Sequence, residues 1–320
     1  MIDIEGLTKK FGPIAAVAGI DLKVSKGEVL GFLGPNGAGK STTMKMVTGY
    51  LAPDAGRVRV CGFDVELDPI SAQRTIGYLP EGAPAYADMT PRQFLGFIAH
   101  VRGFTGKEAK ARIHAVVGKT ELELVLDQPI DTLSKGFKRR VGLAQAILHD
   151  PPVLIMDEPT DGLDPNQKYA VRALLKAMAP DKAIIISTHL LEEVEAICTR
   201  AVIIDRGRVV ADGTPSQLLA RSRHHNAVTL ILPANQAEMA KNKLKNLSDV
   251  SAVEQSARIN GTVELTAFPK SGALLIENVS ALALAEKWDV REMYAEPGRL
   301  DEVFRAITTH DATRARESRS

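Results

Sequence analysis

The chain has 320 residues, of which 45% are hydrophobic and 25% are charged, and its formal net charge is +1. This length suggests about two globular domains, and the near-neutral charge gives no reason to expect nucleic acid or an anionic membrane as the main partner. The segment Met1–Glu5 lacks the features of a signal peptide, and the longest apolar runs are far shorter than the ~20 residues that span a bilayer. We therefore expect a soluble, intracellular protein with reduced cysteines.

The first part of the chain predicts strands on either side of a glycine-rich segment. Ile2–Thr8 and Ile14–Val24 alternate as antiparallel strands. The apolar run Glu28–Leu33 predicts a buried strand, and Ser41–Val47 predicts a helix. Between them lies Gly34-Pro35-Asn36-Gly37-Ala38-Gly39-Lys40-Ser41, which fits the phosphate-binding pattern G-x-x-x-x-G-K-S/T at every fixed position.

This segment has the chemistry of a phosphate loop. Glycines permit positive φ angles and let backbone N–H groups point into a concavity that fits phosphate oxygens, and the following helix adds the positive end of its dipole. Lys40 supplies a charge for the β- and γ-phosphates, and Ser41 supplies a hydroxyl for Mg²⁺. A glycine-rich turn that matches by chance is the plainer alternative, but the strand–loop–helix context favours a nucleoside triphosphate site.

Further strands alternate with helices up to about residue 221. Thr90-Pro91 predicts a helix start, with Thr90 as the N-cap. The pattern predicts an α/β fold at 1–221, with a mostly parallel, doubly wound sheet, an antiparallel β subdomain and a helical insertion at about 83–150. The predicted strands are Arg57–Val60, Ile76–Leu79, Val153–Met156, Ala183–Ser187, Ala201–Asp205 and Arg208–Ala211.

A second domain is predicted at 226–307, after a linker at Ser222–Asn226. Its strands and helices follow the order β-α-β-β-α-β, which predicts a small ferredoxin-like α+β fold. The sequence gathers no titratable side chains into a site here, which favours a bracing or dimer-contact role. Residues 308–320 are polar and are predicted to form a disordered tail.

Two carboxylates end the apolar strand Val153–Met156. Asp157 is placed to hold Mg²⁺ through its water shell, and Glu158 is placed to polarise an attacking water. An acidic pair at a strand end is otherwise often a solvated turn, but the phosphate loop in the same chain favours the catalytic interpretation. His189 follows the strand Ala183–Ser187 and would reach the γ-phosphate at the same sheet edge, although a lone histidine there is more often structural.

The segment Leu133-Ser134-Lys135-Gly136-Phe137 opens a predicted helix and completes a set of five motifs. The others are the phosphate loop, Asp157-Glu158-Pro159-Thr160, Gly162-Leu163-Asp164-Pro165 and His189. In this order they resemble the nucleotide-binding subunits of ABC transporters, over Met1 to about Leu219. A kinase or GTPase would lack the Leu133–Phe137 segment.

The resemblance implies ATP hydrolysis by a head-to-tail homodimer with two ATP molecules at a C2 interface. Lys40, Glu158 and His189 would be catalytic, and Ser41 and Asp157 would hold Mg²⁺, with Glu81 as a further candidate. Phe11 would stack on adenine, while the segment Leu133–Phe137 (the signature) and Asp164 of a second copy would complete the site. The residues implied in ATP binding are Phe11, Gly34, Pro35, Asn36, Gly37, Ala38, Gly39, Lys40, Ser41, Thr42, Ser134, Gly136 and Asp164.

Two positions depart from the commoner family pattern. Glu81 stands where the loop after Leu79-Pro80 usually carries glutamine, and Phe137 stands where the signature usually ends in glutamine. Both departures, and the closing segment Glu296–Phe304, resemble the drug-export and gliding-motility (ABC-2) type of subunit. The permease of that type is a separate membrane protein, to which the Glu81 loop would couple.

The leading hypothesis is the ATPase subunit of an exporter, held at the cytoplasmic face of the inner (plasma) membrane by its permease. A soluble ABC protein of translation or chromosome maintenance is one alternative. The chain has a single phosphate loop, lacks a long coiled-coil insertion and is nearly neutral, so we expect no nucleic-acid partner. An importer subunit is the other alternative.

Overall fold

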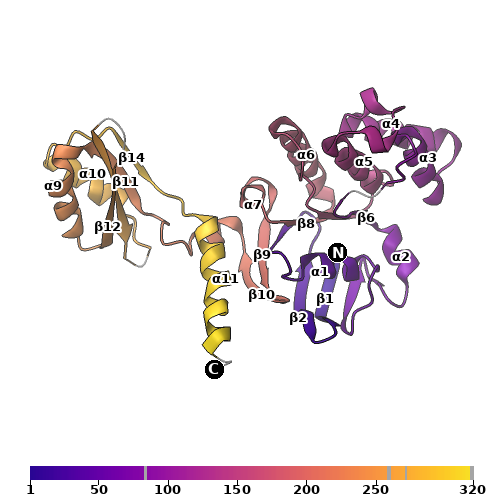
Figure 1. The fold of residues 1–320 in the computed structure, drawn as a ribbon, viewed down its shortest axis with the longest axis horizontal. Helices are drawn as coiled ribbons and strands as arrows, with labels where there is room; N and C mark the ends of the chain where they lie inside the picture. Colours follow the sequence, from indigo (N-terminus) through magenta and orange to yellow (C-terminus); the bar gives the residue numbers. More distant parts are fainter. Residues whose placement is uncertain (83–84, 258–260, 271, 318–320) are drawn as a thin grey trace. The chain divides into compact units, whose positions relative to one another are not determined.

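The computed structural model describes the backbone of residues 1–82, 85–257, 261–270 and 272–317 (Figure 1). The chain divides into two compact units, Met1–Pro215 (unit 1) and Ser216–Ser320 (unit 2). Each unit has hydrophobic core residues of its own.

The central sheet of unit 1 has the strand order β10-β9-β3-β8-β7-β6. Its strands pair in parallel from β6 to β9, and β10 joins β9 as an antiparallel hairpin. Both faces are covered, because Leu154 and Met156 enter one core while Val153 and Ile155 enter another. The predicted, mostly parallel sheet is confirmed. Its strands are β3 (Val29–Leu33), β6 (Ile76–Leu79), β7 (Val153–Asp157), β8 (Ala183–Thr188), β9 (Arg200–Asp205) and β10 (Arg208–Gly213).

A second, antiparallel sheet in unit 1 has the order β2-β1-β4-β5. Ile4 of β1 lies opposite Leu22 of β2 and Val58 of β4, and these residues share a core with Phe32 of the central sheet. The two sheets therefore pack through one hydrophobic cluster, as expected for an antiparallel subdomain. Its strands are β1 (Ile2–Phe11), β2 (Ile14–Val24), β4 (Ala55–Val60) and β5 (Phe63–Asp64).

Helices α3, α4 and α5 gather beside β6 and form the predicted helical region (Figure 1). The predicted start at Thr90 is confirmed, since its side chain accepts from the Gln93 N–H and the Gln93 side chain accepts from the Thr90 N–H. Residues 83 and 84, where this region was predicted to begin, lie outside the described residues. The helices of unit 1 are α1 (Lys40–Val47), α2 (Pro69–Arg74), α3 (Pro91–Val101), α4 (Gly106–Thr120), α5 (Lys135–Ile147), α6 (Pro165–Met178) and α7 (Leu191–Ile197), with 3₁₀ turns η1 (Glu123–Val125), η2 (Ile130–Thr132) and η3 (Ala179–Asp181).

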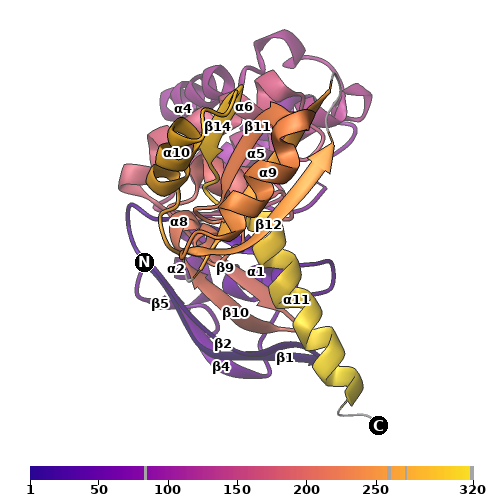
Figure 2. The same cartoon turned by 90° about the vertical axis from the view of Figure 1, so that its left-hand side faces the viewer.

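Unit 2 follows the predicted β-α-β-β-α-β order, after the short helix α8 (Pro215–Leu219). Its sheet has the antiparallel order β12-β13-β11-β14, the arrangement of a ferredoxin-like fold. Helices α9 and α10 lie on one face of this sheet (Figure 2), where Ala240 and Val279 belong to the same hydrophobic core as Leu230. The elements are β11 (Val228–Pro233), α9 (Ala234–Lys245), β12 (Val250–Ala257), β13 (Thr262–Pro269), α10 (Ile276–Ala285) and β14 (Glu292–Ala295).

The closing helix α11 runs from Leu300 to Glu317, beyond the end at Ile307 that the sequence predicted. The helix thus includes residues 308–317, where the sequence predicted a disordered tail, and residues 318–320 lie outside the described residues. Residues 308–317 include neither glycine nor proline, so nothing in the local sequence stops the helix. Across the part of the chain that the structure describes, no helix is both long and apolar enough to span a membrane.

Candidate active site

The glycine-rich loop links β3 to α1 and is packed tightly against two other segments. Gly39 has a φ of 105°, and a Cβ added there would lie 2.2 Å from the carbonyl oxygen of Ala16. A Cβ on Gly34 would lie 2.4 Å from the carbonyl oxygen of Ile204. Gly37 also has a positive φ, of 81°, but faces open space. Gly34 and Gly39 are therefore required by close backbone approach, and Gly37 by its conformation alone.

Lys40 begins α1, and its side chain turns back over the loop. Its Nζ atom donates to the carbonyl of Gly34 at 2.7 Å and to that of Pro35 at 3.2 Å. Burial lowers the pKa of Lys40, while the carboxylates of Glu158, Asp157 and Glu81 oppose this shift. The first turn of α1, all of it described, carries neither a side-chain cap nor an acidic residue. Its N–H groups, including those of Ser41 and Thr42, are thus available to an anion.

Two of the three predicted catalytic side chains meet at the ends of neighbouring strands. Glu158 follows β7 and His189 follows β8, and Nδ1 of His189 lies 2.8 Å from Oε1 of Glu158. Glu158 has a φ of 53°, and its N–H donates to the carbonyl of Ser187 at 2.8 Å. Asp157, the last residue of β7, is 3% exposed. The parallel strands therefore bring Asp157, Glu158 and His189 to one edge of the sheet.

Two more predicted site residues lie at exposed positions around this edge. Glu81 follows β6 and is exposed, and its carboxylate acts electrostatically on both Lys40 and Tyr78. Phe11 is 51% exposed and pairs with Ile14 at the end of the β1–β2 hairpin. Ala16, two residues beyond Ile14, approaches Gly39, so this hairpin end lies near the phosphate loop.

Ser134, Gly136 and Asp164 form a second group, at the starts of α5 and α6. Ser134 accepts from the Phe137 N–H at 3.3 Å, and Asp164 accepts from the Gln167 N–H at 2.9 Å, so each caps its helix. A Cβ on Gly136 would lie 2.7 Å from Oε1 of Gln167, which shows how closely α5 and α6 approach. Sequence reasoning missed the capping role of Asp164, although Asp164-Pro165 is a recognisable helix start.

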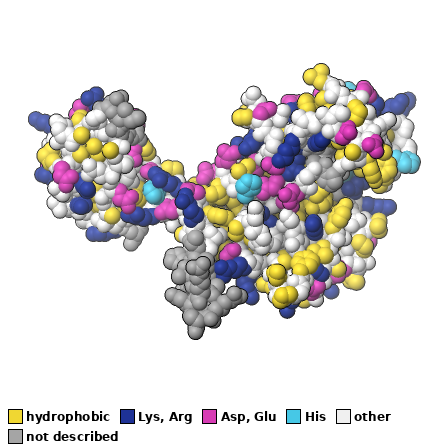
Figure 3. All heavy atoms as spheres, in the orientation of Figure 1, with side chains coloured by type: hydrophobic (Ala, Val, Ile, Leu, Met, Phe, Trp, Pro, Cys, Tyr) yellow, Lys and Arg dark blue, Asp and Glu magenta, His cyan; other side chains and the backbone are white. Residues whose placement is uncertain are grey.

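Charged side chains crowd the neighbouring surface of α6 and α7, as the face drawn in Figure 3 shows. Arg172 of α6 lies 3.1 Å from Glu192 and 3.8 Å from Glu193, both of α7. Glu193 is 0% exposed, and burial raises its pKa. These pairs tie the helix that follows Asp164 to the helix that follows His189.

Sequence reasoning did not identify Arg139, whose side chain contacts the catalytic edge of the sheet. Its guanidinium donates to the carbonyls of Pro80, Asp157 and Glu158. No signal in the sequence distinguishes Arg139 from the neighbouring Arg140, which is also buried on α5.

The donor set around the loop fits Mg²⁺. The Ser41 hydroxyl and the Asp157 carboxylate are hard oxygen ligands, and both belong to elements that converge near Lys40. Among the residues that the structure describes, no group of three or more His, Cys, Asp or Glu could hold a metal ion alone.

Comparison with known proteins decides the family. Residues 17–161 match the family model described as ABC transporter. The chain is also 38% identical over 220 residues to the Nod factor export ATP-binding protein I of Paraburkholderia xenovorans, covering 68% of this chain and 72% of that protein. The chain belongs to the ABC transporter family.

Other members of the ABC transporter family extend this comparison. The linearmycin resistance ATP-binding protein of Bacillus subtilis is 35% identical over 263 residues, which cover 81% of this chain and 85% of that protein. A solved ATP-binding subunit of an ABC transporter superposes with a TM-score of 0.64 at 30% identity, covering 68% of this chain and 91% of the other. The chain is thus an ABC-type ATP-binding subunit with the ATPase fold of the family.

Proposed function

We propose that this chain hydrolyses ATP to drive export through a separate membrane permease. The observation that carries the proposal is the 2.8 Å contact between Glu158 and His189, at the sheet edge that Lys40 faces. The relatives named for Nod factor export and for linearmycin resistance support export over import. The proposed nucleotide-binding domain spans 1–221, and the accessory domain spans 226–307.

The site residues take the following roles in this proposal. The loop N–H groups and Lys40 hold the phosphates of ATP, Phe11 stacks on its adenine, and Ser41 and Asp157 hold Mg²⁺. When bound, Mg²⁺ neutralises negative charge on the β- and γ-phosphates. Glu158 accepts a hydrogen bond from the attacking water and acts as the general base that removes its proton. His189 holds the Glu158 carboxylate in place and contacts the γ-phosphate.

The second group of residues supports action as a head-to-tail homodimer. Ser134 and Asp164 are exposed at the starts of α5 and α6. Lys40 would hold the γ-phosphate from one side, so the opposite side of this phosphate needs further anion-binding groups. A helix N-terminus such as that of α5 supplies such partners. In a C2 dimer, the α5 start of each copy would cover the ATP held by the other.

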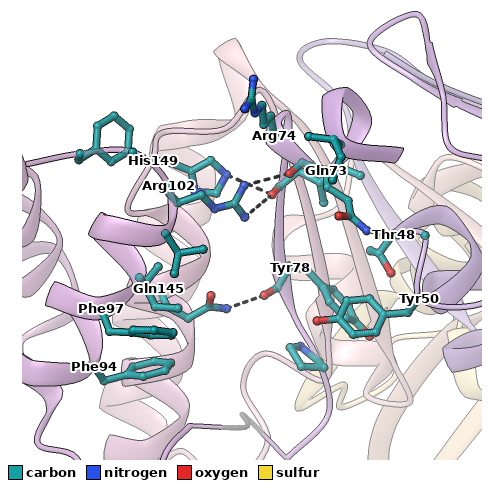
Figure 4. A pocket seen from close by; sticks show the side chains of 18 of the residues that line it. Thr48, Tyr50, Gln73, Arg74, Tyr78, Phe94, Phe97, Arg102, Gln145 and His149 are labelled. Atoms are coloured by element: carbon teal, nitrogen blue, oxygen red, sulfur yellow. Dashed lines mark hydrogen bonds between the residues drawn. The ribbon is translucent and has the colours of Figure 1, made fainter. Parts of the chain in front are cut away.

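A groove in unit 1 fits the expected permease contact. It has a volume of about 1290 Å³ and lies between the α1–α2 region and the helices α3 and α5. Figure 4 shows Phe94 and Phe97 on one side and Tyr50 and Tyr78 on the other. Within the groove lining, Gln145 of α5 donates to the carbonyl of Tyr78 of β6 at 2.6 Å, which joins the two sides.

We assign this groove to a short cytoplasmic helix of the permease with apolar and acidic side chains. Phe97 and Val101 are 40% and 64% exposed, so an apolar helix face would bury them. Arg74 and Arg102 also line the groove, and they favour acidic partners. The groove reaches Pro80, directly before the Glu81 loop, so movement of the docked helix would act on the catalytic edge.

The proposed function is tested by purifying the tagged chain from membranes and identifying what accompanies it. We expect a permease of the ABC-2 type, recovery of the chain with floated membrane vesicles, and loss of both when the permease is deleted. This outcome would place the chain at the cytoplasmic membrane face. Co-sedimentation with ribosomes in place of membranes would contradict the proposal and favour the translation-factor alternative.

Unit 2 is proposed to brace the subunit or contact the second copy. A polar cluster anchors α11 within this unit, since Glu302 accepts hydrogen bonds from Ser222 and His224. Removal of residues 226–320 should weaken dimerisation or transport while ATP binding persists. Unchanged dimerisation and transport would show that unit 2 serves neither purpose.

A further inference from the structure

Arg139 is a buried cation that links three parts of unit 1. It lies on α5 and is 4% exposed. Its Nε atom donates to the carbonyl of Glu158 at 2.9 Å, and one Nη atom donates to the carbonyl of Pro80 at 3.0 Å. The other Nη atom donates to the carbonyl of Asp157 at 2.5 Å and also contacts that of Glu158. One guanidinium therefore joins α5, the signature helix that begins within Leu133–Phe137, to the ends of β6 and β7.

These contacts require the shape of an arginine side chain. A guanidinium is planar and carries its donors in a fixed fork, whereas a lysine ammonium is a compact point charge. Here the fork spans carbonyls at the ends of two different strands, β6 and β7. Burial lowers the pKa of Arg139, and the nearby carboxylates of Asp161, Asp157, Glu158 and Glu81 act in the opposite sense. The acidic catalytic edge thus offsets the cost of burying the cation.

The backbone that Arg139 holds is strained at Glu158. A φ of 53° is left-handed, which a residue other than glycine adopts at a cost and keeps only when its surroundings fix it. The Glu158 N–H is fixed by the Ser187 carbonyl, and the Glu158 carbonyl is fixed by Arg139. This backbone conformation directs the carboxylate toward His189. Loss of the Arg139 contacts would let the peptide relax and turn the carboxylate away.

We propose that Arg139 is a positioning residue through which the signature helix sets the geometry of Glu158 and the start of the Glu81 loop. This inference rests on the proposed function. In the proposed dimer, the start of α5 covers the ATP of the other copy. Arg139 then makes the catalytic geometry of one site depend on occupancy of the other, because any rotation of α5 is transmitted to the Glu158 carbonyl.

The test compares Arg139→Gln and Arg139→Lys with Arg140→Gln in the full-length protein. Arg140 is a matched control because it is 8% exposed on the same helix but pairs with Glu121, at 2.9 Å. We expect both Arg139 variants to lower kcat about tenfold or more, to keep the KM for ATP within about twofold, and to lower the Hill coefficient toward ~1. Arg140→Gln should change none of these. Equal losses in Arg140→Gln, or a higher KM with normal kcat, would overturn the inference.

A double-mutant cycle separates positioning from general damage to the fold. If Arg139 acts through Glu158, then Arg139→Gln should lower the single-turnover rate by less than about twofold in a Glu158→Gln background. If the rate of the double variant instead falls by the product of the two single-variant losses, Arg139 does not act through Glu158. If the unmodified protein does not hydrolyse ATP, the proposed function fails. If it does and Arg139→Gln matches it, this inference alone fails.

Discussion

The Nδ1 atom of His189 lies 2.8 Å from the Oε1 atom of Glu158. The register of two parallel strands sets this distance, since Asp157 of β7, one residue before Glu158, pairs with Ser187 of β8, two residues before His189. A sheet holds such groups more firmly than a surface loop does. The relationship makes Glu158 the residue whose replacement is most informative.

Replacing Glu158 with glutamine should slow ATP hydrolysis by about 10²–10³-fold, because the amide cannot accept a proton from water. ATP binding should persist, since Glu158 is not part of the phosphate loop. The variant should accumulate as an ATP-bound dimer, detectable by gel filtration. Glu195→Gln, at an exposed glutamate of α7, serves as the control and should hydrolyse ATP normally. Near-normal turnover by Glu158→Gln would remove Glu158 from the role of base.

Alanine at Gly39 and at Gly37 should have clearly different effects. Both positions have a positive φ, so the difference between them is the space around the added Cβ. At Gly39 this atom would lie 2.2 Å from the carbonyl oxygen of Ala16, whereas at Gly37 it would meet open space. We expect Gly39→Ala to be less stable than Gly37→Ala by at least ~2 kcal/mol and to bind ATP more than about tenfold more weakly. Urea unfolding and titration with a fluorescent ATP analogue measure both effects. Similar values for the two variants would show that contact with Ala16 does not constrain the loop.

The groove assignment predicts that Phe97→Asp separates the subunit from its permease. Phe97 lines the groove and is 40% exposed, so a charge there costs little folding stability but disfavours an apolar helix. Phe63→Asp is the control, because Phe63 is equally exposed, at 40%, but lies on β5 outside the groove. Co-purification with the permease should fall more than about tenfold for Phe97→Asp only. Retention of the permease by Phe97→Asp would exclude this face as the docking site.

His149 should make the stability of the protein sensitive to mild acid. Its pKa is lowered from 6.5 to about 4, first because burial disfavours the imidazolium and then because Arg102 lies nearby (Figure 4). Its Nε2 lies 3.1 Å from the carbonyl of Ile76, while its Nδ1 is buried with no partner among the described residues. As the pH falls from 6.5 to about 4, the unfolded chain gains a proton that the folded chain does not. Stability is therefore full above this window and declines within it, by up to about 3 kcal/mol.

The measurement is urea unfolding followed by circular dichroism at about pH 7.5 and about pH 4.5. Because carboxylates also respond to acid, the informative quantity is the difference between the protein and its His149→Gln variant. That variant should lose about 2 kcal/mol less over the interval. His100→Gln, at an exposed histidine of α3, should behave like the unmodified protein. Equal acid sensitivity in all three proteins would show that His149 is not responsible.

The sequence predicted the fold wherever both the hydrophobic periodicity and the residues that begin or end an element were clear. The strand Val29–Leu33, the helix start at Thr90 and the order of elements in unit 2 all follow from local patterns. The end of α11 did not follow from a local pattern. The polar composition of residues 308–317 suggested disorder, whereas no residue in this segment breaks a helix. Short helices such as Pro69–Arg74 were also missed, since fewer than two turns carry little periodicity.

The site was predictable as residue types but not as contacts. Motif spacing indicated Lys40, Glu158 and His189, whereas the pairing of Glu158 with His189 depends on how β7 and β8 are aligned. The contacts of Arg139 could not be predicted, because its acceptors are backbone carbonyls, which look the same at every position of a sequence. Motif reasoning can find a local helix cap such as Thr90, but it cannot find a contact between a side chain and a main-chain carbonyl far away in the sequence.

The hairpin turn between β9 and β10 carries a constraint that its surface position hides. The Gly207 N–H donates to the carbonyl of Ala38 at 2.9 Å, and the Gly207 carbonyl accepts from the Ala18 N–H, also at 2.9 Å. A Cβ on Gly207 would lie 2.8 Å from the carbonyl oxygen of Ala16. Engineers commonly choose hairpin turns for epitope tags or circular permutation, and this turn would be a poor choice. An insertion at residues 206–207 would remove a clasp that holds the phosphate loop to β2, and it would disable nucleotide binding from a site that looks expendable.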